Sequence, residues 1–389
     1  MPTATDRGRR RWLGAALLGA LSPWPVQSAR VTERTPTAPA TRHWVTAWNA
    51  ADGHRIGLLR GDASGTSIAD QLAVPTRAHG LQILPDGSVL AVARRPGDWL
   101  LRWQPLAPSP SRRAASIPTP ETVWAGPQRQ FNGHALLHPD GRHLLVTETD
   151  TAAPDDPDGL GRGRVTVRRL DRLATVVADW PTGGRDPHQL LASPDGRWLW
   201  VANGGIASRP ETGRTRLESA PMDASVVAID LATGELARRW TLDDDRLSLR
   251  HLAWHAPTAT LGIALQAEHA DPVHRNSAPV LALLQPLDAQ ARLRTVESPQ
   301  PMAGYGGDVC ATTDGFAVSS PRAGRLGCWQ AGGDWVGGVA LAEVCALAPQ
   351  DGGVVAAGQR QAVDWSALSG SSGHPLALPV MPDNHWVCR

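Results

Sequence analysis

A Pro-Asp-Gly turn between two short apolar segments recurs along this 389-residue chain and constrains its fold more than any other feature. The complete Pro-Asp-Gly copies are centred on Asp86, Asp140 and Asp195, a degenerate copy has Pro257-Thr258 at the turn, and two further copies keep only Asp314-Gly315 and Asp351-Gly352. The first copies are spaced about 55 residues apart, which indicates a repeat architecture. Two apolar segments joined by a short Asp-Gly turn are typical of a β-hairpin.

An apolar segment follows each turn. These segments cover residues 89–93, 144–147, 199–202, 261–265, 316–319 and 354–357. Residues 163–170 and 225–230 supply a third segment in two of the copies. Units of about fifty residues with four short strands are typical of β-propeller blades. No long segment has a 3.6-residue apolar period, so we predict an all-β fold with little helix.

The two ends of the chain complete the ring. Residues 43–59 form a hairpin without a preceding inner strand, and residues 385–388 form one apolar strand without a following hairpin. Together they make one blade, which removes the free sheet edge of an open ring. With the six hairpins between them, they predict a single seven-bladed β-propeller over residues 43–389. Six blades is the alternative.

The N-terminus has the pattern of an export signal. Arg9, Arg10 and Arg11 precede Trp12-Leu13 and an apolar run that ends near Pro23. This order resembles a twin-arginine signal peptide, which we place at residues 1–29, followed by a linker over residues 30–42. An uncleaved amphipathic tail is the alternative. We expect a periplasmic monomer without a transmembrane segment in the mature chain, because the apolar run is too short to span a bilayer.

Composition and cysteine spacing argue against two classes of protein, nucleic-acid binders and zinc fingers. The formal net charge of +1 argues against a nucleic-acid partner, which normally requires a basic face. No CxxC motif occurs among Cys310, Cys328, Cys345 and Cys388, so a zinc finger has no support. We favour buried thiols, with a disulfide between Cys310 and Cys345 as the alternative. The acidic segment 151–163 lacks EF-hand spacing, and we interpret it as a solvated loop.

Histidines and carboxylates occupy the start of the predicted inner strands. They are His79, His134, His188, His251, Asp308, Glu343 and His385. In a propeller these positions meet at the channel mouth, and imidazole and carboxylate groups suit iron, copper or another divalent metal. A structural role of the histidines is the interpretation that the repeat alone favours, and a metal site formed by these residues is the functional alternative. His134 lies five residues before the turn proline instead of six, so it points elsewhere unless a bulge compensates.

A second set of polar residues follows the inner hairpins. The ligand-binding candidates are Glu148, Asp150, Asn203, Arg250 and Arg322. We favour solvated charges at these positions, with a small ligand or an anion bound near Arg250 and Arg322 as the alternative. No GxSxG, HExxH or Walker motif occurs, so no hydrolase or nucleotide-binding signature supports an enzyme.

Several blocks of the chain resemble a bacterial family of exported propeller-like proteins, the domain of unknown function 1513. The blocks are Gly133-His134, Pro187-His188, Asn203-Gly204-Gly205-Ile206, Arg250-His251-Leu252 and Ser320-Pro321-Arg322. The family is encoded beside imelysin-type lipoproteins, which implies a periplasmic role in iron uptake. Thr149 stands where the family has Asn, which puts a ligand role there in doubt. The repeat also resembles YVTN-type and WD40-like propellers, although fold alone does not decide function.

Three functions follow from these features. The first is a metal-binding or protein-docking accessory of periplasmic iron-uptake proteins, which would not be an enzyme. The second is a metal-dependent lactonase-like hydrolase at the channel mouth, with Glu148 and Glu343 as the first candidates for a base. The third is a scaffold in which the histidines are structural.

Overall fold

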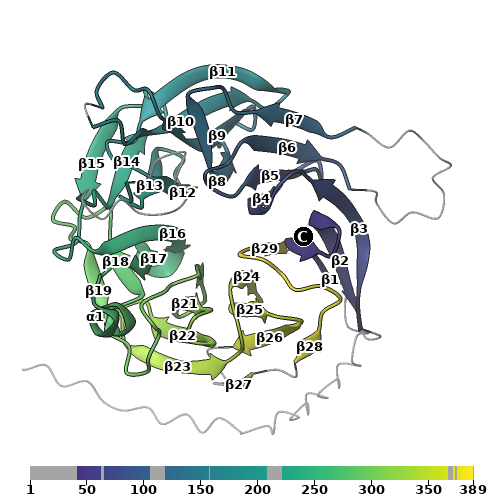
Figure 1. The fold of residues 1–389 in the computed structure, drawn as a ribbon. Coiled ribbons are helices and arrows are strands. Elements are labelled where there is room, and N and C mark those ends of the chain that lie inside the picture. Colours follow the sequence, from purple (N-terminus) through teal and green to yellow (C-terminus); the bar gives the residue numbers. More distant parts are fainter. Residues whose placement is uncertain are drawn as a thin grey trace, which may run out of the picture. The chain divides into compact units, whose positions relative to one another are not determined.

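The computed structural model describes residues 42–62, 65–105, 119–156, 158–207, 221–366, 371–372 and 375–388. Within these ranges the chain forms seven antiparallel sheets around a central axis (Figure 1). This arrangement confirms the seven-bladed propeller and excludes the six-bladed alternative. The predicted signal peptide and linker lie outside the described residues, except for Arg42, which already belongs to the first strand.

We number the blades in chain order. Blade 1 contains β29 (Trp386–Cys388), β1 (Arg42–Ala50), β2 (Gly53–Asp62) and β3 (Gly65–Val74). Blade 2 contains β4 (Ala78–Ile83), β5 (Val89–Ala93), β6 (Trp99–Trp103) and β7 (Glu121–Trp124). Blade 3 contains β8 (Arg129–Leu137), β9 (His143–Asp150), β10 (Arg162–Arg169) and β11 (Arg172–Pro181). Blade 4 contains β12 (Pro187–Ala192), β13 (Trp198–Asn203), β14 (Ser225–Asp230) and β15 (Leu236–Trp240).

The remaining blades follow the same order. Blade 5 contains β16 (Leu247–His255), β17 (Thr260–Ala267), β18 (Leu281–Leu284) and β19 (Arg294–Val296). Blade 6 contains β20 (Asp308–Ala311), β21 (Gly315–Ser320), β22 (Arg325–Gln330) and β23 (Trp335–Ala340). Blade 7 contains β24 (Ala346–Gln350), β25 (Gly353–Gly358), β26 (Gln361–Ser366) and β27 (Ser371–Ser372), and β28 (Leu376–Ala377) also pairs with β26.

The innermost strands form a closed ring around the channel. Each of β29, β4, β8, β12, β16, β20 and β24 contacts the innermost strands of its two neighbours. Polar groups at equivalent positions of these strands therefore meet near the axis, although they come from distant parts of the sequence. This ring is what positions the candidate site.

The hydrophobic core lies between consecutive blades. The second strands β5, β17, β21 and β25 are buried along their whole length, because a neighbouring blade covers each face. Between blades 4 and 5, the rings of Trp200 and Trp254 stack at 4.8 Å. The outermost strand β11 instead alternates between exposed and less exposed residues, as a strand with one solvated face should.

Blade 1 closes the ring with both ends of the chain, as predicted. Strand β29 pairs antiparallel with β1, with Trp44 opposite Cys388 and Thr46 opposite Trp386. The rings of Trp44 and Trp386 stack at 5.5 Å, and both side chains are almost fully buried. Strand β29 therefore supplies the pairing partner of β1, which the N-terminal segment alone does not provide.

Helix is scarce among the described residues, in agreement with the sequence. The structure contains one short helix, α1 (Pro272–Ser277), and one 3₁₀ turn, η2 (Ala256–Thr258). Neither has the length and apolar content that crossing a lipid bilayer requires. All four cysteines are free thiols.

The acidic segment after β9 is only partly solvated, which corrects the sequence interpretation. Asp155 and Asp158 are largely exposed, but the side chain of Asp156 is 2% exposed. Asp156 accepts a hydrogen bond from the backbone nitrogen of Gly161 at 2.6 Å and lies 3.5 Å from the buried Arg185 guanidinium. A buried carboxylate is tolerated here because it has these partners.

Candidate metal centre in the channel

Bulges in the inner strands turn the predicted histidines toward the axis. The pairing of β4 with β5 breaks between Ala78 and Leu81, on either side of His79, and comparable breaks occur in blades 4 and 5. In blade 3 the break between Phe131 and Ala135 contains one residue more than those bulges. The additional residue compensates for the shorter spacing before the turn proline, so His134 reaches the channel with the others.

Glycine is required at the bulge of β8. Gly133 has a φ of 96°, in the left-handed region that side chains disfavour. A Cβ atom at this position would also lie 2.6 Å from Cδ2 of His79. The Gly-His pair in this blade therefore serves the close approach of two histidine rings.

Five histidines from blades 1 to 5 converge in the channel. They are His79, His134, His188, His251 and His385, and each is less than 10% exposed. Their ring centroids are separated by 4.6 Å (His251 and His385) to 5.8 Å (His79 and His251) where they contact. One nitrogen each from His79, His134, His251 and His385 lies within 4.8 Å of the other three. We call these four residues the histidine cluster.

Burial favours the neutral form of His79, His134, His188 and His251. Desolvation lowers the pKa of His79, His134 and His251 well below the usual 6.5, and neighbouring histidines lower it further. The pKa of His188 falls for the same main reason, with the charge of Arg250 as the next contribution. Neutral imidazole has a free lone pair, which is the form that binds metals.

Arg250 distinguishes His188 from the cluster. Its Nη2 atom donates to Nδ1 of His188 at 3.1 Å, and its Nη1 atom donates to Asp186 at 2.5 Å. Because arginine is always a donor, Nδ1 of His188 is the acceptor and the proton of the neutral ring is on Nε2. That Nε2 lies 3.1 Å from Nε2 of His79 and 3.0 Å from Nε2 of His251. His188 is therefore a hydrogen-bond donor within the channel and has no free lone pair for a metal.

His385 has the environment of a metal ligand. Its Nδ1 atom lies 3.0 Å from Oδ2 of Asp308, which places the proton on Nδ1. The Nε2 atom is buried without a hydrogen-bond partner among the described residues. A carboxylate that orients a histidine through its second nitrogen is the usual support of metal-binding histidines. Asp308 thus fits a supporting role.

Two further members of the cluster have a buried nitrogen without a hydrogen-bond partner among the described residues, Nε2 of His134 and Nδ1 of His251, whereas both nitrogens of His79 have polar neighbours. An unsatisfied buried polar atom costs about 1–3 kcal/mol, so such atoms are uncommon. Coordination of one metal ion would give the partnerless nitrogens of His134 and His385 a partner. The residues present therefore fit a metal.

The donor set indicates which metals the cluster favours. Four imidazoles suit zinc, copper, nickel or iron, whereas calcium and magnesium prefer oxygen ligands. A tetrahedral site with bonds of 2.0–2.1 Å needs nitrogens about 3.4 Å apart. Because the four nitrogens lie within 4.8 Å, binding requires the rings to move closer by about 1 Å.

The structure separates Glu343 from the other predicted ring residues. It precedes β24 in a left-handed conformation with a φ of 52°, is exposed, and lines a pocket above the channel. Strand β24 begins three residues later, at Ala346, so Glu343 does not occupy the inner-strand position that the sequence indicated.

Most of the second predicted set forms structural contacts. Arg168 donates to the buried Glu148 at 2.7 Å. Asp150 lies 3.5 Å from the Arg129 guanidinium. Asn203 donates to the carbonyl oxygen of Thr182 at 3.0 Å. Arg322 is different, because its guanidinium lies over the ring of Tyr305 at 4.2 Å in the pocket above the channel.

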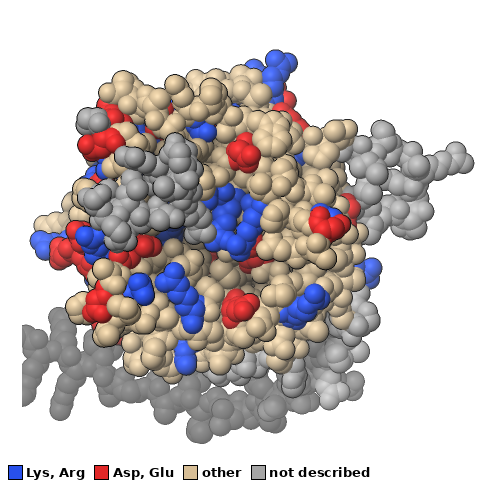
Figure 2. Space-filling view, viewed as in Figure 1, with Lys and Arg blue, Asp and Glu red and all other residues tan. Residues whose placement is uncertain are grey.

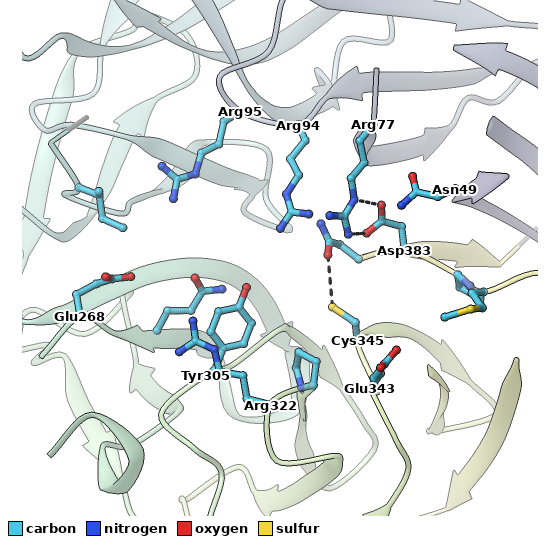
Figure 3. A pocket seen from close by; sticks show the side chains of 16 residues that line it. Asn49, Arg77, Arg94, Arg95, Glu268, Tyr305, Arg322, Glu343, Cys345 and Asp383 are labelled. Carbon is cyan, nitrogen blue, oxygen red and sulfur yellow. Dashed lines mark hydrogen bonds and ion pairs between the residues drawn. The ribbon is translucent and has the colours of Figure 1, made fainter. Parts of the chain in front are cut away.

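Arginines surround the mouth of the channel. Figure 2 shows basic side chains gathered at the centre of the face in view. They border a cavity of about 720 Å³ with lining residues that include Arg77, Arg94, Arg95, Arg322 and Tyr305 (Figure 3). A cavity of this volume is in the range of small-molecule sites. We call it the arginine pocket.

Sequence reasoning missed several residues of this region. Arg94 and Arg95 come from a loop of blade 2, and Arg77 comes from the connection between blades 1 and 2. Asp186 lies two residues before the predicted His188, and Asn384 directly precedes His385. Asp186 forms ion pairs with both Arg250 and Arg95, the latter at 3.0 Å. The side chain of Asn384 lies 2.7 Å from Nδ1 of His79. Proximity in sequence to a predicted histidine was the only sequence signal for Asp186 and Asn384.

The chain is similar to one protein family and to several solved structures. The profile of the family described as "Protein of unknown function (DUF1513)" matches residues 72–389. A nidogen/laminin complex is 10% identical, with 90% of this chain and 98% of that chain covered and a TM-score of 0.46. Apo AztD from Citrobacter koseri is 10% identical, with 91% and 98% covered and a TM-score of 0.49. A functionally unknown protein from Desulfotomaculum acetoxidans DSM 771 is 12% identical, with 77% and 86% covered and a TM-score of 0.46. No curated protein matches the chain.

Proposed function

The chain belongs to the family of proteins of unknown function DUF1513, and because that description names no reaction, we propose a function from the channel itself: binding of one transition-metal ion. The four nitrogens of His79, His134, His251 and His385 within 4.8 Å of one another carry this proposal. The burial of all four side chains, the lowered pKa of His79, His134 and His251, and the partnerless nitrogens of His134, His251 and His385 support it. Such a site binds metal without the competition of protons that exposed histidines have.

The biological setting of the proposal is metal handling in the periplasm, with iron uptake as the process. The twin-arginine pattern at residues 9–13 and the family resemblance support this setting. Iron, copper or another divalent metal is the expected ion, and iron-uptake proteins are the expected partners. Binding without turnover is the favoured role, and the lactonase-like hydrolase stays a prediction. Its first candidate base, Glu148, is paired with Arg168, and the second, Glu343, is exposed at the pocket rim.

Equilibrium dialysis of the metal-free protein tests the proposal. The protein is stripped with a chelator, dialysed separately against Zn²⁺, Co²⁺, Cu²⁺ and Fe²⁺, and analysed for bound metal by mass spectrometry. We expect one ion per chain. The double variant His79→Gln/His251→Gln should bind no measurable metal, because it lacks two ligands. Equal metal content in the double variant and the unmodified protein would refute the site.

Two single variants separate ligands from supporting residues. Asp308→Asn should weaken metal binding by about 10–100-fold, as expected for loss of a group that orients a ligand. His188→Gln should weaken it far less, because a glutamine oxygen accepts from Arg250 and His188 is not a ligand. His274→Gln is the matched control, since the His274 side chain is 75% exposed on α1. Circular dichroism of each variant establishes that it is folded.

The docking role has its own test. Affinity capture from a periplasmic extract, with the unmodified protein and the double variant as baits, identifies partners and their dependence on metal. Recovery of metal-uptake proteins would support the docking role. Recovery of none from an extract that contains such proteins would count against it.

A further inference from the structure

The arginine pocket continues down to the histidines. A small cavity of about 10 Å³, which has room for about one water molecule, lies beside His79, His188 and His251. Five of the residues that line it also line the arginine pocket: Arg94, Arg95, Gln266, Tyr305 and Asn384. The arginine pocket therefore opens directly onto the histidines.

The charges around this path favour an anion. Four arginines line the pocket against three carboxylates, and one of these, Asp383, is in an ion pair with Arg77. In Figure 3, Glu268 lies at the left of the view and Glu343 lies below Cys345, on the side of the pocket opposite Arg94 and Arg95. Below, Asp186 is shared by Arg95 and Arg250. An arginine guanidinium presents two parallel N–H groups, which match the geometry of carboxylate and phosphate oxygens.

A metal in the histidine cluster would increase this excess of positive charge. Its four ligands would be imidazoles, and Asp308 contacts the cluster through His385. A buried charge requires compensation by a nearby opposite charge. Arg94 lines the small cavity together with His79 and His251, which places its side chain beside the site. An anion bound between the metal and Arg94 would balance the positive charges of both.

The size and lining of the pocket indicate the class of anion. About 720 Å³ is more than a single inorganic anion fills. The face of Tyr305 is already covered by the Arg322 guanidinium, so the lining does not favour a flat aromatic ligand. We propose that the arginine pocket binds a small di- or tricarboxylate, one carboxylate of which completes the coordination of a metal in the histidine cluster. The coordination part of this inference rests on the proposed function, whereas binding of the carboxylate does not.

Calorimetric titration of the metal-free protein with citrate tests the pocket alone. We expect binding that weakens about tenfold or more in Arg322→Gln and in Arg94→Gln, because each removes a charge-assisted hydrogen bond. Arg322→Lys should weaken citrate binding too, since lysine keeps the charge but lacks the two parallel N–H donors of arginine. Arg172→Gln, an exposed arginine on β11, is the control and should bind as the unmodified protein does. Absence of citrate binding, or equal affinity in all variants, would overturn the inference.

Inorganic phosphate is the comparison ligand. Phosphate that binds as tightly as citrate would overturn the polycarboxylate class and leave only a general anion site. Much weaker phosphate binding would support the proposal.

Coupling between the two sites tests the coordination. Succinate, a weak chelator in solution, is titrated into the metal-free and the Zn²⁺-loaded protein. We expect tighter binding to the loaded protein, and thermodynamic linkage then requires succinate to tighten metal binding by the same factor. Equal succinate affinity in both forms would overturn the coordination but not the pocket. Citrate binding by a protein that takes up no metal would refute the proposed function and leave the arginine pocket supported.

Discussion

Acid should destabilise the metal-free propeller in proportion to the number of buried neutral histidines. The pKa values of His79, His134, His188 and His251 all lie well below 6.5, mainly because of burial. In the unfolded chain the same groups titrate near 6.5. Below that pH the unfolded state binds protons that the folded state does not, so stability falls as the pH falls toward the lowered folded pKa values.

Linkage gives the magnitude. Between pH 7.5 and pH 5.5, each histidine that stays neutral when folded removes about 1.4 kcal/mol from the free energy of unfolding. Four such groups remove about 5–6 kcal/mol together. A typical domain is stable by only about 5–15 kcal/mol, so the effect should be large. The carboxylates with lowered pKa values, such as Asp140, titrate below this window.

Urea denaturation at several pH values, with a chelator present, measures this loss. His134→Gln and His251→Gln should each reduce the loss by about 1.4 kcal/mol, because glutamine does not titrate. His274→Gln should leave the loss unchanged, because that side chain is exposed on α1. A loss below about 1 kcal/mol in the unmodified protein, or the same loss in all three variants, would refute the buried neutral state.

Three further predictions concern the frame of the site. Arg250→Met should lower stability by about 3 kcal/mol in urea denaturation, because it removes a partner of the buried Asp186 although Arg95 remains. Trp386→Ala should cost about 3–5 kcal/mol in the same assay, since this buried ring closes blade 1 against Trp44. Thiol titration without reductant should count four free thiols after unfolding and fewer in the native protein, where burial raises the pKa of Cys328 to about 12. Stability unchanged in the first two, or fewer than four thiols after unfolding, would contradict these expectations.

The fold was predictable because its signals are local. Each Pro-Asp-Gly turn fixes one hairpin, and the apolar segment after it is buried on both faces between blades, as in β5 and β25. The closure of blade 1 followed from an unpaired hairpin at one end and an unpaired strand at the other. None of this required contacts between distant residues to be known in advance.

The site was predictable only in part, because its chemistry depends on distant contacts. The histidines share a position in the repeat, but the role of His188 is set by Arg250 in the next blade. Bulge length decided the direction of His134, and the sequence does not state bulge length. The arginine pocket combines loops of different blades, such as those of Arg94 and Arg322, at unrelated positions in the repeat.

The most direct test of the account is the anomalous X-ray signal of crystals loaded with Co²⁺, measured on both sides of the cobalt absorption edge. The account predicts one peak in the channel, with a nitrogen of His79, His134, His251 and His385 each about 2.1 Å away. His188 should remain outside this shell, hydrogen-bonded to Arg250. A peak elsewhere in the protein, a shell that includes His188, or no peak in the channel would contradict the proposed metal centre.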